Sequence, residues 1–575
     1  QMKIKSPGLV SSTVIIACLA FLCHGCCGYA APRSDVHRRN NCTGVVKEIK
    51  PWTVLVYLNA DNDLGVFINN RVQKIKTAVS GESLNILIQF DGQSLNDSKR
   101  IYLRGSSDPK ASGNIVCMEN IEYDMLDPQT LADFTAWGIE NFPSRRIAVI
   151  MASHGMGILN LPKNGSRRIS PPGRAQHSSV VSFSYDGYWQ YMDQEKMVSE
   201  LGGVLKKYNR GEKIDIFAFD SCLMGNFETL TTLSPVANYA IASEYLITYS
   251  NAFQQNKTYG LPVDSFIDQL SRYPDDNIRK TGRRIVTRFR DNYEGFGIHH
   301  SGSGKTYYPE SSLALYDLSH AEAARDYLTS MVKEFTAMAV YRPALFEALF
   351  RELLKAHLLY DPVGYIDLAH FAEIIHRISG LESAEKLVSF LNNRNKFIHA
   401  KTILHTLSQS PPSGISIFFP NYIVSGKEGF IGKLYSFYKE LEITRDTGLN
   451  NLLGKYLNAV EQKRAQMLTR IIEEHIHYNQ KFRFEPSQGI YDELYLFTIT
   501  EIALYPLLDK KKYHAVRKYL EMIAASAYKS LYLDMHRKDM RRYLERIKSK
   551  EVDTVNRVEI TELIDLFENV VLSED

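Results

Sequence analysis

The sequence predicts an α/β fold in which helices cover both faces of a mainly parallel central sheet, followed by a helical C-terminal region. Runs of β-branched and aromatic residues, such as residues 52–58 and 84–90, are typical of strands buried on both faces. Amphipathic helical segments alternate with these runs, as parallel strands require. From about residue 450 onward the spacing of apolar residues is almost wholly helical.

The predicted strands and helices follow one another in a regular order. Asp193 stands where it can cap one of the helices. We expect strands at residues 52–58, 84–90, 147–153, 214–219, 239–243, 312–316 and 414–419, a hairpin around 101–116, and helices at 64–79, 129–142, 193–208, 272–292 and 321–337.

Length and composition limit the classes of protein. A chain of 575 residues exceeds what one ordinary core accommodates, so we expect two or three domains. A hydrophobic content of 44% with 23% charged residues is typical of a globular chain and argues against intrinsic disorder. The net charge of +3 is close to neutral for this length, so nucleic acid is not expected as a partner.

The first thirty residues have the pattern of an export signal. Lys3 and Lys5 precede a mostly apolar run at residues 9–23, and a small-x-Ala cleavage site ends at Ala30. The run is short for a stable membrane span. Residues 15–18 also resemble a bacterial lipoprotein box ending at Cys18. We therefore expect export from a bacterial cell, either as a secreted or periplasmic protein or as a surface lipoprotein with a lipid anchor.

Cysteine usage singles out one thiol. Four of the seven cysteines fall in the predicted signal, which leaves Cys42, Cys117 and Cys222. Three cysteines do not make a disulfide scaffold. Cys42 and Cys117 could pair, and Cys222 would then be the odd thiol.

Two reactive side chains directly follow predicted strands. His154 comes after the strand at 147–153, and Cys222 comes shortly after the strand at 214–219. Because ligands of parallel sheets bind beyond the carboxyl ends of the strands, we expect the imidazole and the thiol at one edge. Such a pair can perform thiolate catalysis. The competing interpretations are an inert buried cysteine and a structural histidine.

The surroundings of Cys222 favour a reactive thiol. A helix is predicted to begin at Leu223, and a helix N-terminus stabilises a thiolate. Asp220 lies two residues before the cysteine. Its carboxylate could line a substrate pocket, or it could cap the following helix.

A basic segment interrupts the strand–helix alternation at residues 160–184. Its part from 163 to 174 is rich in Gly, Pro, Ser and basic residues, which indicates an exposed loop. Proteolytic nicking concentrates in such loops. The alternative is a plain flexible surface segment.

Four segments, taken together, resemble the clostripain family of cysteine peptidases. They are Trp-Thr-Val-Leu-Val-Tyr-Leu-Asn-Ala-Asp-Asn-Asp-Leu at 52–64, Ser-His-Gly at 153–155, Phe-Asp-Ser-Cys-Leu-Met at 219–224 and Gly-Ile-Ser-Ile-Phe-Phe-Pro at 414–420. The resemblance covers about residues 50–438. It implies the caspase-like α/β/α sandwich, shared more distantly with legumains and gingipains, and cleavage of peptide bonds after Arg or Lys. It also implies self-cleavage between the catalytic histidine and cysteine.

The resemblance assigns roles to particular residues. His154 and Cys222 would be the catalytic pair, and Asp220 would line the primary specificity (S1) pocket, where a carboxylate pairs with guanidinium or ammonium. The backbone N–H groups of Gly155 and Cys222 would form the oxyanion hole. We find no clear second acidic partner for the pocket at residues 243–249, so the preference between Arg and Lys stays open.

The resemblance also bears on maturation and cofactors. The candidate bonds for self-cleavage, which would give a two-chain form, follow Arg168, Arg167, Lys163 and Arg174. The chemistry requires no cofactor. Calcium dependence occurs in the family, and Asp61 and Asp63 are candidate oxygen ligands, although their spacing matches no defined calcium loop.

These observations predict an exported cysteine endopeptidase whose substrates are proteins or peptides with Arg or Lys at the cleaved position. The alternative is a catalytically silent caspase-like binding protein or a surface scaffold protein. The expected organisation is a signal peptide at 1–30, a linker at 31–50, a peptidase domain at 51–445 with an activation loop near 160–184, and a helical region of unknown role at 446–575.

Overall fold

The computed structural model describes residues 48–158, 180–247, 260–460 and 541–572, together with single positions between 508 and 521. Shorter gaps lie within these ranges, at residues 63, 79–82, 95, 105–112, 184–188, 295–297, 301–304, 308–309, 357–363, 406–411, 421–434 and 542–543. The predicted export signal, Cys42, Asp63 and the four candidate self-cleavage residues lie outside the described residues.

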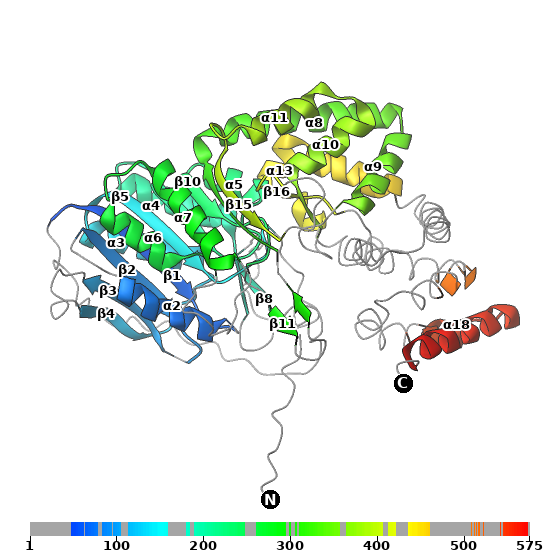
Figure 1. Ribbon diagram of the computed structural model, residues 1–575, viewed down its shortest axis with the longest axis horizontal. Helices are drawn as coiled ribbons and strands as arrows, with labels where there is room; N and C mark the ends of the chain where they lie inside the picture. Colours follow the sequence, from blue (N-terminus) through cyan, green and yellow to red (C-terminus); the bar gives the residue numbers. More distant parts are fainter. Residues whose placement is uncertain are drawn as a thin grey trace, which may run out of the picture.

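A nine-stranded sheet forms the centre of the molecule (Figure 1). Its five middle strands, in the order β10-β9-β5-β1-β2, are parallel, whereas the strands at both edges are antiparallel. The prediction of a mainly parallel central sheet is therefore confirmed. The strands are β1 (Lys50–Asn59), β2 (Leu84–Asp91), β3 (Ser98–Arg104), β4 (Gly113–Ile121), β5 (Ser144–Ala152), β9 (Ile214–Asp220), β10 (Ala237–Ala242), β13 (Ser311–Asp317) and β15 (Ile398–Leu404).

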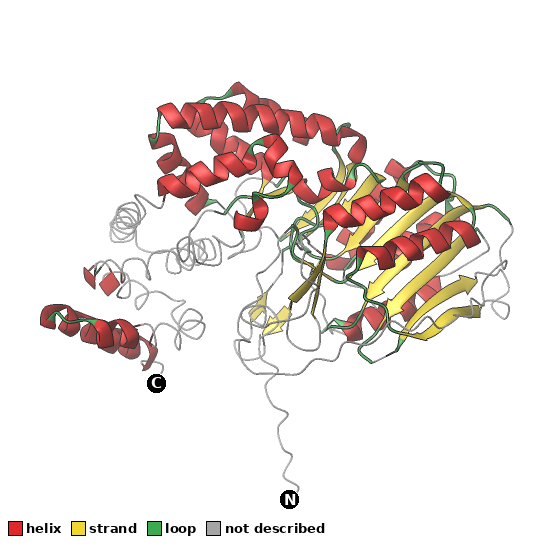
Figure 2. Cartoon of the chain, turned by 180° about the vertical axis from the view of Figure 1, so that it is seen from behind, coloured by secondary structure: helices red, strands yellow, loops and turns green. Residues whose placement is uncertain are grey.

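Helices cover both faces of this sheet, as Figure 2 shows from behind. Alternate residues of a strand point to opposite faces. Leu55 and Tyr57 of β1 pack in one apolar core with α3 (Pro128–Asn141) and α4 (Gln194–Tyr208). Val54 and Val56 pack in the other core with α2 (Gly65–Ala78), α6 (Val263–Arg272) and α7 (Ile278–Tyr293). Asp193 caps α4 as predicted, through its side chain and the Lys196 N–H.

A second group of helices lies beside the sheet (Figure 1). It contains α8 (Ala321–Tyr341), α9 (Ala344–Lys355), α10 (Leu368–Ser379) and α11 (Glu382–Asn392). A two-stranded sheet of β14 (Tyr365–Asp367) and β16 (Ser416–Phe418) accompanies these helices. The core on the α3–α4 face continues without a break into this group, so burial of one apolar surface holds the two parts together.

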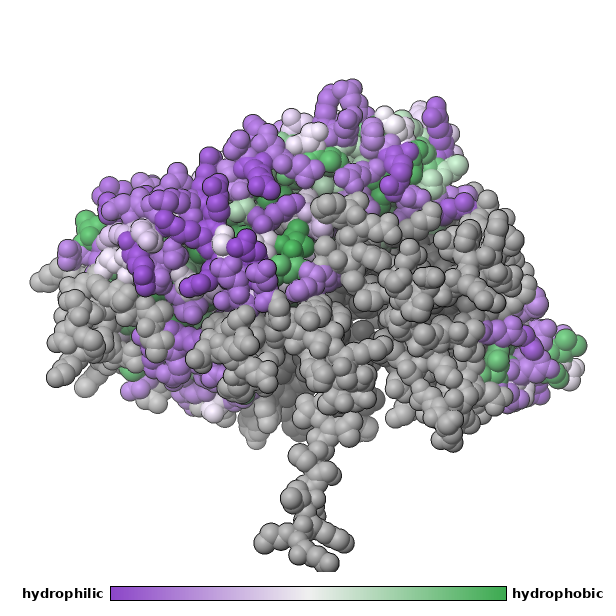
Figure 3. Space-filling view, in the orientation of Figure 1, coloured by the Kyte–Doolittle hydropathy of each residue, from purple (hydrophilic) through white to green (hydrophobic). Residues whose placement is uncertain are grey.

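Later segments are also helical where the structure describes them. The helix α13 (Glu442–Thr447) runs across residue 445, and α18 (Thr554–Leu572) lies near the C-terminus. None of the helices in the described ranges combines the length and apolar character needed to cross a bilayer. In Figure 3 the described part of the visible face is mostly hydrophilic, with small separate hydrophobic spots.

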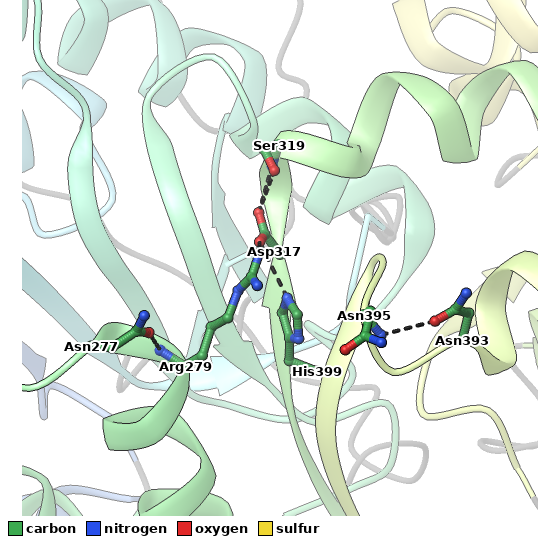
Figure 4. A network of polar contacts seen from close by, with 7 residues as sticks. All are labelled: Asn277, Arg279, Asp317, Ser319, Asn393, Asn395 and His399. Atoms are coloured by element: carbon green, nitrogen blue, oxygen red, sulfur yellow. Dashed lines mark hydrogen bonds and ion pairs between the residues drawn. The ribbon is translucent and has the colours of Figure 1, made fainter.

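A polar network fastens the edge of the sheet opposite the carboxyl ends of the parallel strands (Figure 4). The buried Asp317 carboxylate accepts from Arg279 Nη2 at 2.9 Å and from Ser319 Oγ at 2.6 Å, and it lies 3.2 Å from His399 Nε2. Burial alone would raise the pKa of Asp317, but the hydrogen bonds from Ser319 and Arg279 bring it below its ordinary value. The network joins α7, β13 and β15.

Two predictions around the site are wrong in detail. The helix after Cys222 is α5 (Phe227–Leu233), which begins four residues later than predicted and is capped by Asn226 rather than Asp220. Residues 180–183, predicted as part of the loop, form strand β7 (Val180–Phe183). A three-stranded sheet of β6 (His154–Gly155), β7 and β8 (Trp189–Met192) results, because the backbone of residues 180–183 pairs with that of His154.

Candidate active site

Strand register brings the regions of His154 and Cys222 together. β5 and β9 are adjacent and parallel, and Ala152 pairs with Asp220 at their carboxyl ends. His154 and Cys222 each follow two residues after this pair. Both residues are partly buried. The predicted shared edge is therefore present in the fold.

Gly155 is packed directly against the backbone of Cys222. A methyl group on its Cα would overlap the carbonyl oxygen of Cys222 and would lie 3.0 Å from the Cys222 amide nitrogen. The close approach of the two backbone segments requires a residue without Cβ. The loops that carry the imidazole and the thiol thus lie in mutual backbone contact.

The backbone after Cys222 adopts an unusual conformation. Leu223 has φ of 60°, in the left-handed region that leucine rarely enters. Two backbone hydrogen bonds hold it there, from Leu223 N to Tyr245 O at 3.1 Å and from Gly225 N to Ser243 O at 2.7 Å. The segment directly after β10 therefore fixes the turn that presents the thiol.

The sulfur of Cys222 contacts a backbone amide. The Ile247 N–H donates to Sγ over 3.1 Å, and Sγ lies 3.6 Å from the Ile247 carbonyl oxygen. Cys222 is a free cysteine, whereas Cys117 is disulfide-bonded. A donated N–H stabilises negative charge on sulfur. The Ile247 N–H can therefore stabilise a thiolate at Cys222, the role that the sequence predicted for a helix N-terminus.

Asp220 is buried and paired within the protein. Its Oδ2 lies 2.8 Å from Nη2 of Arg71, and its Oδ1 accepts from the Leu261 N–H at 2.7 Å. The side chains of Asp220 and Arg71 are only 0% and 4% exposed. Sequence reasoning missed Arg71, although a signal was present. Arg71 falls on the apolar stripe of its helix between Ile68 and Ile75, where a charged residue needs a buried partner.

Glu244 is fully buried but belongs to a different environment. Burial, and after it the charge of Asp367, raise the pKa of Glu244 well above its ordinary value. Asp367 itself accepts from the backbone N–H groups of His370 and Ser413. Glu244 is therefore held toward its neutral form beside β14.

The sheet of β14 and β16 contacts both the loop after His154 and the loop after Cys222. The Tyr365 hydroxyl donates to Met156 O at 3.0 Å and accepts from Ile158 N at 2.9 Å, just after His154. On the cysteine side, Ser416 N donates to Gly225 O at 3.0 Å. Gly157 has φ of 66°, and a Cβ there would overlap the Tyr365 hydroxyl. Sequence reasoning missed this contribution because Tyr365 lies more than 200 residues from the loop it contacts.

Glu228 links the same small sheet to the helix after Cys222. Its Oε1 accepts from Phe418 N at 3.1 Å and from the Tyr438 hydroxyl at 3.0 Å. Complete burial raises the pKa of Glu228 to about 7, although these hydrogen bonds oppose the shift. Downstream residues thus contact both sides of the site.

The calcium candidates find little support from the described turn. Asp61 is half-buried, and the side-chain oxygen of its neighbour Asn62 accepts from Leu64 N at 2.9 Å. Asp63 lies outside the described residues. Within the described part of the chain, no three His, Cys, Asp or Glu side chains are grouped so that they could hold a metal ion. We derive no step through calcium.

Comparison with known proteins points to one family. The model of the clostripain family (Peptidase_C11) matches residues 56–441. Clostripain of Hathewaya histolytica is 22% identical over 216 residues, which is 34% of this chain and 38% of that relative. The matched part thus spans well under half of the relative's length.

Solved structures give weaker likeness. An inactive zymogen of a C11 protease from Parabacteroides distasonis is 16% identical, with 70% of this chain and 99% of that chain covered and a TM-score of 0.47. A secreted C11 cysteine protease from Bacteroides thetaiotaomicron, bound to an irreversible peptide inhibitor, is 18% identical, with the same coverage and a TM-score of 0.48.

Proposed function

The chain belongs to the clostripain family, and on this premise we propose that it is a cysteine endopeptidase with Cys222 as nucleophile and His154 as acid–base residue. The observation that carries the proposal is the pairing of Ala152 with Asp220, since it sets the two loops side by side at the carboxyl edge of the sheet. The tight contact between the backbones of Gly155 and Cys222 supports it further.

The proposed reaction proceeds through an acyl-enzyme. His154 takes the thiol proton, and Sγ of Cys222 attacks the carbonyl carbon of the scissile peptide, forming a C–S bond. The C–N bond then breaks, and the imidazolium returns the proton to the leaving amine. A water molecule, deprotonated by His154, hydrolyses the thioester and releases the new carboxylate together with the thiol. No cofactor takes part.

Charge on the attacked oxygen needs nearby donors. We assign this role to the backbone N–H groups of Gly155 and Cys222, because the two segments are in close backbone contact beside the proposed nucleophile. For the primary specificity pocket we assign Asp220, which would favour Arg or Lys at the cleaved position. Its place two residues before the nucleophile supports the assignment.

Maturation and export complete the proposal. Cleavage after Arg168, Arg167, Lys163 or Arg174 would give two chains, and the pairing of β5 with β9 would keep both in one sheet. The pattern of residues 1–30 supports export, with a lipid anchor at Cys18 as the alternative to release. We assign the peptidase unit to residues 51–445.

The test compares the wild-type protein with Cys222→Ala and His154→Ala. The wild type should be cut within residues 160–184 and should turn over peptides with Arg or Lys at the cleaved position, whereas both variants should stay intact and inactive. His320→Ala is the matched control, because His320 contacts the Phe390 ring edge-on in the remote helical group.

Two outcomes would oppose the proposal. If the wild type stays single-chain and turns over no peptide, the result favours the alternative hypothesis of a catalytically silent binding or scaffold protein. If the wild type and Cys222→Ala are cut alike, self-cleavage is wrong even where peptide turnover persists.

A further inference from the structure

We propose that Arg71 is a specificity-determining residue: it competes with the substrate's basic side chain for the Asp220 carboxylate. The inference rests on the proposed function and deepens it. Asp220 does not offer an open carboxylate in this fold, because it is completely buried and already holds a guanidinium that belongs to the chain itself.

Both oxygens of Asp220 are engaged from separate elements. Arg71 of α2 forms an ion pair with Oδ2, with its Nη2 at 2.8 Å. The Leu261 N–H, just before α6, donates a hydrogen bond to Oδ1 at 2.7 Å. A substrate guanidinium binds a carboxylate best through two parallel hydrogen bonds, which need both oxygens. Each carboxylate oxygen can accept more than one hydrogen bond, so the Leu261 N–H can stay in place. A substrate guanidinium and Arg71, however, would compete for Oδ2.

Charge leads to the same conclusion. Arg71 stays protonated at every physiological pH, so the Arg71–Asp220 pair has no net charge. Tyr293 adds no negative charge to this pair, because burial raises the pKa of its phenol above the ordinary value and so keeps it neutral. With Arg71 in place, a second cation gains little attraction from Asp220. A neutral side chain at the same position loses nothing.

A purely structural role for the pair makes a different prediction. In that case Arg71 only fastens α2 to the end of β9, and its removal weakens folding without changing substrate preference. A competing role changes the preference between a basic and a neutral residue at the cleaved position. The ratio of the two turnover rates therefore separates the roles, since a general loss of stability lowers both rates together.

The experiment uses matched peptides with arginine or citrulline at the cleaved position. Citrulline keeps the shape of arginine without its charge. In Arg71→Gln, the ratio of kcat/KM for arginine over citrulline should rise about tenfold, which corresponds to about 1.4 kcal/mol, through a lower KM for the arginine peptide. In Asp220→Asn the ratio should fall below the wild-type value, because Arg71 then remains as an uncompensated cation. Arg71→Lys keeps a charge but loses the planar fork, so a smaller rise is expected.

Arg279→Gln is the matched control. It removes another Arg–Asp pair, with Asp317 at 2.9 Å, at the opposite edge of the sheet, and it should leave the ratio unchanged. Thermal unfolding confirms that each variant is folded, and Arg71→Lys carries the test if Arg71→Gln does not fold. An unchanged ratio in the folded Arg71 variants overturns the inference while wild-type turnover still supports the proposed function. No turnover by the wild type overturns both.

Discussion

At the scale of single residues, backbone groups rather than a helix dipole prepare the proposed nucleophile. Leu223 adopts the left-handed conformation, which a hydrogen bond to Tyr245 holds in place, and so sets the direction of the turn. The Ile247 N–H contacts the sulfur. Strained residues of this kind persist only where their surroundings fix them. Their presence beside Cys222 is consistent with a site that is formed before substrate arrives.

The contact between Gly155 and Cys222 can be tested by a single methyl group. Gly155→Ala should lower kcat by at least about 100-fold, because its Cβ would overlap the Cys222 carbonyl oxygen and push the two loops apart. Gly203→Ala in α4 is the control, since a Cβ there meets nothing within 4 Å. Wild-type turnover in folded Gly155→Ala would contradict the described packing.

Glu228 should make stability depend on pH. Its pKa of about 7 in the folded protein exceeds the ordinary value of 4.5, so the folded state holds the proton more tightly than the unfolded state. The resulting stability is fully present below about pH 4.5 and is lost as the pH rises through about 7. The Glu228→Gln variant cannot ionise at this position. Its free energy of unfolding should therefore fall by up to roughly 3 kcal/mol less than that of the wild type over this pH range.

Urea unfolding at pH 5 and pH 8 measures this effect. The free energy of unfolding of the wild type should fall more between the two pH values than that of Glu228→Gln. The exposed Glu322→Gln serves as control. Equal falls in the wild type and Glu228→Gln would show that Glu228 does not titrate in this window.

At the scale of elements, a two-stranded sheet outside the main sheet connects the histidine and cysteine loops. β14 holds Met156 and Ile158 through one phenol, while β16 holds Gly225 and, through Glu228, the helix α5. A loop is normally mobile unless its backbone groups are bonded. The helical group beside the sheet therefore contributes to the geometry of the site.

Tyr365→Phe removes both hydrogen bonds of that phenol. We expect kcat to fall about tenfold with little change in KM, because the His154 loop loses its anchor while the substrate pocket is untouched. Tyr57→Phe is the matched control, since it loses a comparable buried bond, from its hydroxyl to Met125 O at 2.8 Å. Equal kinetics for the two variants would assign Tyr365 a purely structural role.

At the scale of the whole molecule, local patterns were enough to predict most strands of the sheet and the edge shared by His154 and Cys222, but not the edge strand β15. Buried strands and amphipathic helices have short-range periodicity, so the sequence could predict where they lie. The edge shared by His154 and Cys222 follows from these positions. The contacts of Arg71 with Asp220 and of Tyr365 with Met156 join distant segments. No periodicity encodes such pairs, and the conformation of Leu223 likewise depends on its tertiary partners.

The continuous core explains why the helical group could not be separated by sequence. Apolar residues of α8 to α11 belong to the same buried cluster as Phe217 and Phe219 of β9. A helical pattern states which face of a helix is buried but not against what it packs. The length of the chain suggested two or three domains. Within the described residues, one of the two apolar cores extends from the sheet into the helices α8 to α11.

Covalent labelling tests the proposed catalytic pair most directly. The folded protein is incubated with an electrophilic peptide that carries Arg at the reactive position, and the adduct is mapped by mass spectrometry. We predict one adduct on Cys222, none in Cys222→Ala, and at least about 100-fold slower labelling in His154→Ala. No adduct on Cys222, or equal labelling rates in the wild type and His154→Ala, would contradict the proposed roles of Cys222 and His154.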